Sequence, residues 1–247
     1  MAWTETSSLS FTARHEAGEA DEVVAVLDTL EDHRARLERL FPSVPEGITV
    51  IFHDSPLQLG LAQPYLPLAR MFASAAGRRY MAGWFGRDEV HVLAPEALRR
   101  RAGGQGSLEA LMLSPQRVYT LLVVGSNNPF LPPPFRPSAF ARLVRLAWLA
   151  EGAAQYFSGQ LPHLRPAFAR RLREGPVRFP PGPRDAPLLG GVLFDVLARE
   201  RGEPACVALA CGEDGEDPRR ALQSAFAAGS VDVAYSCRRR LEEIAGV

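Results

Sequence analysis

The stretch WLAEGAAQYFSG, residues 148–159, carries a single carboxylate, Glu151, in the middle of a largely apolar run. The apolar helical pattern begins earlier, so we predict one helix over residues 138–158. A helix this apolar packs inside a protein, where an unpaired carboxylate is costly. We therefore expect Glu151 to have a partner, to be protonated or to line a cavity. A glutamate at the solvent-facing edge of the helix is the alternative that composition alone favours.

The segment before this helix predicts a second buried helix. Ser114-Pro115 is a favourable helix start, and the apolar pattern continues to about residue 126. Residues 128–137, NPFLPPPFRP, contain five prolines and are neither helix nor central strand. The remaining helical patterns lie at about 163–174, 187–201, 203–211, 217–228 and 230–245.

The first hundred residues predict a small mixed sheet with a helix packed on it. Strands are expected at 8–15, 47–53 and 89–95, a helix at 21–41, and a small-residue turn, AGWFG, at 82–86. The fold class is thus α+β, with an α/β lobe over residues 1–103 that includes an edge strand and a mostly helical lobe over 107–247. Residues 102–107, AGGQGS, connect the two lobes. We interpret Gly103-Gly104-Gln105-Gly106 as a linker, since it resembles a phosphate-binding loop only in composition.

Composition narrows the classes of partner. The formal net charge is zero, which argues against electrostatic binding to nucleic acid or to a membrane. All 28 basic residues are arginine, a bias that we attribute to the coding genome of a bacterium. The three cysteines have no paired spacing, and Cys206 and Cys211 fall within an apolar helical pattern, so they are expected to be core thiols. Because no apolar run is long enough to span a bilayer and the N-terminus does not resemble a signal peptide, we expect a cytoplasmic location.

The segment WLAEGAAQYFSG resembles the W-L-x-E-G-x-A-x-Y segment of gluzincin metallopeptidases, the peptidase-MA-like group. The order of elements is also similar: GITVIFHDS at 47–55 and AGWFGRDEVHVLAP at 82–95 resemble the upper sheet and edge strand of these proteins, and YSCRRRLEEI at 235–244 resembles the terminal helix of small members. This resemblance implies a zincin-like fold in which Glu151 stands at the position of the third zinc ligand. It also implies that the helix 114–127 stands where H-E-x-x-H would supply two imidazole ligands and a general base.

The chain departs from the gluzincin pattern at the metal helix. No histidine lies between His91 and His163, and no acidic residue lies between Glu109 and Glu151. Zinc needs two imidazoles one helical turn apart, and valine, glycine, serine and asparagine cannot replace them. We therefore predict that no metal is bound and that the protein is a catalytically inactive peptidase-MA-like protein with a binding or structural role. An arginine partner of Glu151, for example Arg142 or Arg145 from its own helix or one from the C-terminal lobe, would fit replacement of the metal by a salt bridge.

Other histidines offer weaker metal sites. His15-Glu16-Ala17-Gly18-Glu19 is one residue short of H-E-x-x-H, but Gly18 and the preceding strand pattern favour a strand-to-helix turn. The isolated histidines His33, His53, His91 and His163 are expected to be surface or hydrogen-bonded residues. The alternative function is a metal-dependent hydrolase with a rearranged zinc site, formed by Glu151 with His163 or His15.

The cleft that would hold the substrate in a gluzincin is expected between the helices 114–127 and 138–158. Its vestigial ligand position is Glu151, and the residues near it are Trp148, Gln155, Tyr156, Asn127 and Asn128. A peptide or protein is the expected partner, with a peptide adding as a strand to 89–95. A third hypothesis makes the helical lobe a docking surface for another protein or for a second copy.

Overall fold

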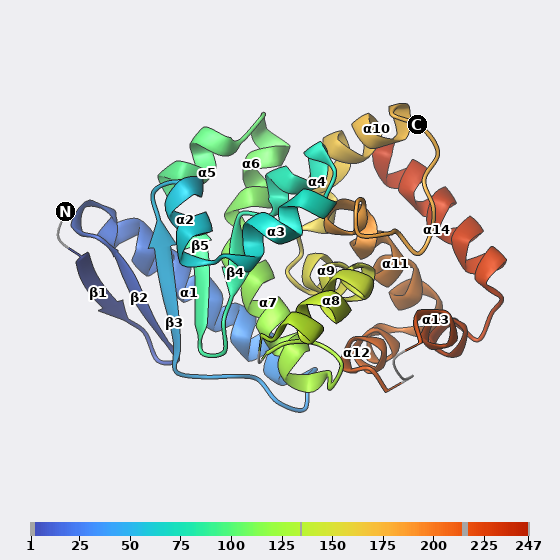
Figure 1. Ribbon diagram of the computed structural model, residues 1–247, viewed down its shortest axis with the longest axis horizontal. Helices are drawn as coiled ribbons and strands as arrows, with labels where there is room; N and C mark the ends of the chain where they lie inside the picture. Colours follow the sequence, from blue (N-terminus) through green and yellow to red (C-terminus); the bar gives the residue numbers. More distant parts are fainter. Residues whose placement is uncertain (1–2, 134, 214–216, 247) are drawn as a thin grey trace.

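A five-stranded mixed sheet occupies one end of the molecule, and the helices of the C-terminal part fill the other (Figure 1). The computed structural model describes residues 3–133, 135–213 and 217–246; Pro134, in the proline-rich segment, lies outside the described residues. The arrangement confirms the α+β class, with a small N-terminal sheet followed by a mostly helical region.

The strand order in the sheet is β1-β2-β3-β5-β4. β1 (Trp3–Ser7) pairs antiparallel with β2 (Phe11–Glu16), β2 and β3 (Ile48–His53) pair in parallel, β3 and β5 (Glu89–Leu93) pair in parallel, and β4 (Gly83–Phe85) pairs antiparallel with β5. The β-branched residues of β3 and β5 explain why these two strands form the buried centre.

The prediction of an edge strand at 89–95 is wrong, because β5 is paired on both sides. The edge strand on this side of the sheet is β4, where the sequence predicted a turn. Gly83 accounts for its close packing: a Cβ there would lie 2.6 Å from the His91 carbonyl oxygen and 2.8 Å from Val118 Cγ2. A strand of three residues beginning with glycine is too short for periodicity to reveal.

Helices connect the strands of the sheet. The long helix α1 (Ala20–Glu38) follows β2 and buries Val23, Leu27 and Leu30, as its helical spacing predicts. α2 (Pro56–Ala62), α3 (Tyr65–Phe72) and α4 (Ala75–Tyr80) were missed, although Ser55 and Ser74 cap α2 and α4 through their hydroxyls. α5 (Pro95–Arg101) follows β5, and α6 (Gln105–Met112) begins inside the segment that the sequence analysis assigned to a connector.

The later helices are α7 (Ser114–Asn127), α8 (Pro137–Arg145), α9 (Ala147–Phe157), α10 (Arg165–Arg173), α11 (Ala186–Arg201), α12 (Glu203–Cys211), α13 (Pro218–Phe226) and α14 (Ser230–Ala245). The predicted single helix over 138–158 is two helices, because Leu146 leaves helical geometry at φ −98° and ψ 19°. Cys206, Cys211 and Cys237 are buried and unpaired, as expected of core thiols.

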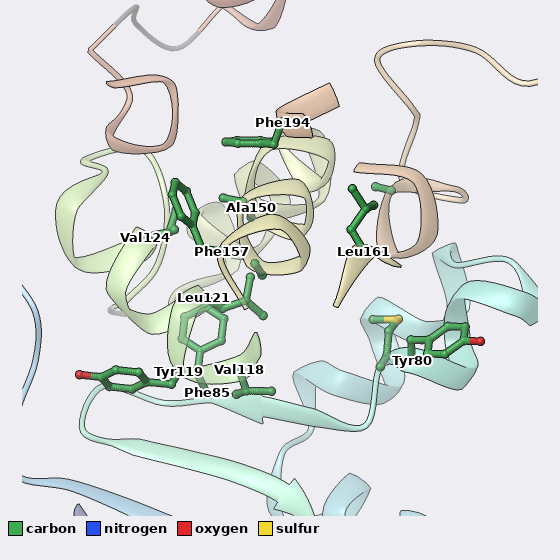
Figure 2. Packing of buried hydrophobic residues seen from close by; sticks show 14 of the residues in the cluster. Tyr80, Phe85, Val118, Tyr119, Leu121, Val124, Ala150, Phe157, Leu161 and Phe194 are labelled. Atoms are coloured by element: carbon green, nitrogen blue, oxygen red, sulfur yellow. The ribbon is translucent and has the colours of Figure 1, made fainter. Parts of the chain in front are cut away.

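α7 lies between the sheet and the helical region and contacts β4, β5, α1 and α9. Figure 2 shows Val118 and Leu121 of α7 beside Phe85 of β4, with Ala150 and Phe157 of α9 on the other side. The buried apolar residues form one continuous cluster across both regions. No helix among the described residues is both long enough and apolar enough to cross a membrane.

Candidate functional site

Glu151 of α9 is paired with Arg117 of α7, whose Nη2 donates a hydrogen bond to Glu151 Oε2. Arg117 is 1% exposed and Glu151 is 8% exposed, so the ion pair is almost fully removed from water. The attraction between the two opposite charges offsets part of the free energy that it costs to remove each of them from water. The buried carboxylate therefore has a partner, which is one of the three outcomes that the sequence predicted.

The partner is neither Arg142 nor Arg145. Arg117 belongs to the C-terminal lobe, 107–247, which was the third source of an arginine that the sequence offered, and it lies on α7. The sequence did contain a signal, because Arg117 is the only charged residue between Glu109 and Arg136. A lone cation in a buried helix needs an anion, and Glu151 is the corresponding lone anion in the buried helix α9.

A small apolar cavity lies beside Glu151. Met81, Trp84, Phe140, Leu143 and Ala147 are among its lining residues, and its volume is about 30 Å³. This volume suits one or two water molecules and is far below the 300 Å³ or more that is typical of ligand sites. The space next to the carboxylate is therefore too small for a peptide.

The edge strand β4 is covered by the proline-rich segment. The ring of Phe135 lies 5.7 Å from that of Trp84 and 5.1 Å from that of Phe85, centroid to centroid. The same ring stacks on Tyr65 of α3 at 5.4 Å. All three residues of β4 are buried, so this edge does not offer its hydrogen-bonding groups to an added strand.

Gln155, expected near the cleft floor, is buried and bonded to α11. Its Nε2 donates to the Ala186 carbonyl at 3.3 Å, and its Oε1 accepts from the Gly191 amide at 2.9 Å. Trp148 is buried as well, and Tyr156 packs edge-on against Phe157. Burial raises the pKa of Tyr156 to about 12. These three side chains hold α9 in the core.

Asn127 and Asn128 lie at the end of α7, where they line a different cavity of about 480 Å³ with Arg136 and Arg142. The Asn127 side chain bonds both backbone groups of Ser43, at 3.0 and 2.6 Å. Asn128 donates to the Ala210 carbonyl at 2.8 Å. The structure thus does not bring the predicted cleft residues together in one cavity.

The histidines are hydrogen-bonded. His33 Nε2 lies 2.9 Å from Thr120 Oγ1 of α7, and burial lowers the pKa of His33 to about 4, with a further contribution from Arg36. His53 Nε2 lies 3.0 Å from His91 Nδ1, and the two rings stack. Burial lowers the pKa of both, that of His53 to about 4.

The H-E-x-x-H-like segment forms the strand-to-helix turn that the sequence favoured. His15 lies in β2, and a short 3₁₀ turn, Ala17–Glu19, follows the strand. His15 is buried, with its Nε2 2.8 Å from Thr6 Oγ1. His163 lies partly exposed, 2.9 Å from Glu109 Oε2, and each of these histidines thus has a partner other than Glu151.

The residues around Glu151 do not fit a zinc ion. A guanidinium, which carries no lone pair for a metal and repels a cation, holds the carboxylate. Leu121, one helical turn after Arg117, is apolar. Within the described ranges no three histidine, cysteine or acidic side chains are grouped as metal ligands.

Comparison with known proteins gives no match for this chain. No protein-family model matches it, and neither the curated proteins nor the solved structures contain a significant relative.

Proposed function

We propose that this chain is a non-catalytic gluzincin-like protein in which the Arg117–Glu151 ion pair stands in place of the zinc site. One observation carries the proposal: the carboxylate of the WLxEG segment is bound by a cation from the facing helix α7. In a metallopeptidase the same carboxylate binds zinc, which activates water. A fixed guanidinium balances the charge but does not supply a hydroxide nucleophile.

The surroundings of the pair favour a binding or structural role over hydrolysis. A hydrolase needs a cavity that admits substrate, whereas the space beside Glu151 has a volume of about 30 Å³. Phe135 covers the strand along which a substrate would lie. A partner protein in the cytoplasm would thus bind elsewhere on the surface.

Exposed apolar side chains on α2 and α3 support a protein partner or self-association. Leu57 and Leu61 lie four residues apart on α2, and Leu68, Met71 and Phe72 share one face of α3. Exposed apolar surface of this kind is enriched at protein interfaces. Light scattering over a range of protein concentrations tests whether these exposed side chains mediate self-association.

Metal analysis tests the proposed loss of the zinc site. We expect protein purified without chelator to contain no stoichiometric zinc, and added zinc neither to raise its melting temperature nor to produce hydrolysis of a casein substrate. Glu151→Gln, which keeps the shape of the side chain, serves as the matched variant. Stoichiometric zinc that disappears in Glu151→Gln would contradict the proposal and support a hydrolase with a rearranged site.

A further inference from the structure

Five of the ten large apolar side chains that are exposed among the described residues lie on the consecutive short helices α2 and α3. Leu57 and Leu61 of α2 are 72% and 76% exposed, and Met71 of α3 is 78% exposed. Leu68 and Phe72 of α3 are half exposed. Figure 1 shows both helices on the side of the molecule turned towards the reader, in front of the sheet. Apolar side chains gathered on one face in this way mark an interaction surface.

The two helices join into one continuous surface. Gly60 of α2 packs beside Pro67 of α3, since a Cβ at Gly60 would lie 3.4 Å from Pro67 Cγ. Leu61 directly follows Gly60, and Leu68 directly follows Pro67. The exposed side chains of the two helices therefore lie in adjoining turns, and we call them together the α2–α3 face.

A recess lies at one end of the α2–α3 face. Phe72 also lines the cavity beside Glu151, together with Phe140 of α8 and Pro183. The ring of Tyr65 lies 5.1 Å from that of Phe140, centroid to centroid, and this contact ties α3 to α8. At about 30 Å³ the cavity can take the end of one apolar side chain and no more. An anchoring side chain loses more contact with water in such a recess than on a flat surface.

The elements that form the α2–α3 face carry charge of one sign. Residues 55–87, which include α2, α3 and α4, contain four arginines and no acidic residue, and the carboxylates that bound this stretch are Asp54 and Asp88. The helix α8, on the other side of the recess, carries two arginines and no acidic residue. Electrostatic complementarity therefore calls for a partner with negative charge.

Arg184 places one of these positive charges next to the recess. Its carbonyl oxygen accepts a hydrogen bond from the Ser74 amide at 2.7 Å, just after α3 ends, and the residue is exposed. The neighbouring carboxylate, Asp185, is bound instead by Arg171, with Arg171 Nη2 2.7 Å from Asp185 Oδ2. Arg184 thus keeps its charge available to a partner.

A second copy of the chain fits the α2–α3 face poorly. In a symmetric dimer the same patch from each chain meets itself, so the arginines beside it would face one another and repel. A lipid surface also fits less well, because the chain as a whole has no net charge and is not drawn to an anionic membrane. An acidic protein partner satisfies both the apolar side chains and the arginines.

From these observations we infer that the α2–α3 face binds an acidic amphipathic helix of another protein. Apolar side chains three and four residues apart on that helix would cover Leu61, Met71 and Phe72, and carboxylates beside them would meet Arg184. The inference rests on the proposed binding role and names the class of partner.

A pair of synthetic peptides tests the inference on the full chain. The first is about 15 residues long, with leucines at helical spacing on one face and glutamates and glutamines on the other. In the second, lysines replace the glutamates. Fluorescence anisotropy at constant ionic strength is expected to show saturable binding of the acidic peptide and at least about tenfold weaker binding of the basic one. Absence of saturation with the acidic peptide, or equal binding of the two, overturns the inference.

Apolar variants test where the peptide binds. Leu61→Gln and Met71→Gln are each expected to weaken binding of the acidic peptide about tenfold, because each removes an apolar anchor. Their melting temperatures are expected to stay close to that of the wild type, since both side chains are largely exposed. The control is Val231→Gln, which alters a side chain of α14 that is 79% exposed. Equal binding by all three variants rules out the α2–α3 face.

A charge variant tests the role of the arginine beside the recess. Arg184→Gln is expected to weaken binding severalfold and to make it less sensitive to salt, as loss of a charge at the rim of an interface does. Arg238→Gln removes the same charge from an exposed position on α14 and is expected to have little effect. Equal weakening by both variants contradicts the role assigned to Arg184.

Two further measurements separate this partner from the others. If the chain binds vesicles of phosphatidylcholine and phosphatidylserine but not the acidic peptide, the face is a lipid-binding surface and the inference fails. If light scattering shows a dimer that Met71→Gln dissociates, the occupant is a second copy, which also overturns it. Zinc-free protein that binds no peptide would refute this partner alone, whereas zinc held by Glu151 in protein that binds the peptide would refute only the proposed loss of the zinc site.

Discussion

At the scale of single residues, the Arg117–Glu151 ion pair is the feature on which the proposed loss of the zinc site rests. Arg117 is the one charged residue of α7 and Glu151 the one charged residue of α9, and both are nearly inaccessible to water. A buried ion pair adds little net stability, because desolvation offsets most of the attraction. Removing one partner is a different matter, since the other charge is then left unpaired in the core.

Arg117→Met is therefore expected to lower the free energy of unfolding by about 3–5 kcal/mol. The double variant Arg117→Met/Glu151→Leu is expected to recover most of this loss, because two apolar side chains need no compensation. Urea denaturation of the wild type, the single variants Arg117→Met and Glu151→Leu, and the double variant measures the coupling.

The matched control for this cycle is Arg14→Met, which removes an exposed arginine whose Nε lies 2.9 Å from Glu5 Oε1. An exposed pair contributes at most about 1 kcal/mol, so Arg14→Met should change stability little. A loss below about 1 kcal/mol for Arg117→Met would show that Glu151 is adequately compensated without this arginine.

His33 predicts a pH dependence of stability. Burial lowers its pKa to about 4 in the folded protein, against about 6.5 in the unfolded chain. Between these values the unfolded chain binds more protons, so stability falls as the pH is lowered from about 6.5 towards 4, by at most about 1.4 kcal/mol per pH unit.

His33→Gln, which keeps a donor for Thr120, is expected to reduce this slope. His53 and His91 titrate in both proteins, so the difference between wild type and variant isolates His33. Urea denaturation from pH 7 to pH 4.5 measures it. Parallel stability profiles for the two proteins would refute the assignment.

At the scale of elements, the glycine of the WLxEG segment has a packing role. Gly152 of α9 faces Gly190 of α11, and the two helices are in close contact. A Cβ at 152 would lie 2.7 Å from the Gly190 carbonyl oxygen, and one at 190 would lie 2.8 Å from Gly152 Cα. The backbones approach so closely that neither position can hold a side chain without displacing a helix.

Gly152→Ala is expected to destabilise the protein by about 1–3 kcal/mol, despite the better helix propensity of alanine. Gly60→Ala in α2 is the matched control, because its Cβ would meet only Pro67 Cγ, at 3.4 Å. Thermal denaturation should separate the two, with the control unchanged or slightly stabilised. Equal behaviour of both variants would rule out a packing role for Gly152.

At the scale of the whole molecule, α7 connects the sheet to the helical region. Its residues are buried from Ser114 to Gly125, with β4 and β5 packed on it as well as α9. α7 packs against the sheet on one side and against α9 on the other. Unfolding either region alone would therefore expose apolar surface of α7 to water. The two predicted lobes therefore share one core rather than having one each.

Native-state hydrogen exchange should consequently show a single cooperative unit. We expect the slowest amides of β3 and β5 and those of α9 and α11 to open with the same free energy as denaturant is added. Exchange of the helical region at a distinctly lower free energy would indicate two independently unfolding lobes. The sequence division at 102–107 would then be a true domain boundary.

Local patterns anticipated a large part of this structure. The strands β3 and β5, the helix α1 and the helices α11, α12 and α14 lie close to their predicted bounds, because each has clear periodicity and recognisable ends. The strands β1 and β4 and the helices α2 to α4 were missed, since they are short and their stability depends on neighbours. The sequence also shows that α7 and α9 each contain one charged residue, Arg117 and Glu151.

Which charges meet, and which surfaces are closed, depended on the tertiary structure. Side chains far apart in the sequence come together only through packing, and no local pattern reports that packing. Arg117 is thus the partner of Glu151, and Phe135 covers β4. The sequence by itself determined that a carboxylate in an apolar helix, with no histidine nearby in the sequence, had to have a partner, be protonated, line a cavity or face solvent. The fold decided among these outcomes, because only packing brings Arg117 within reach of Glu151.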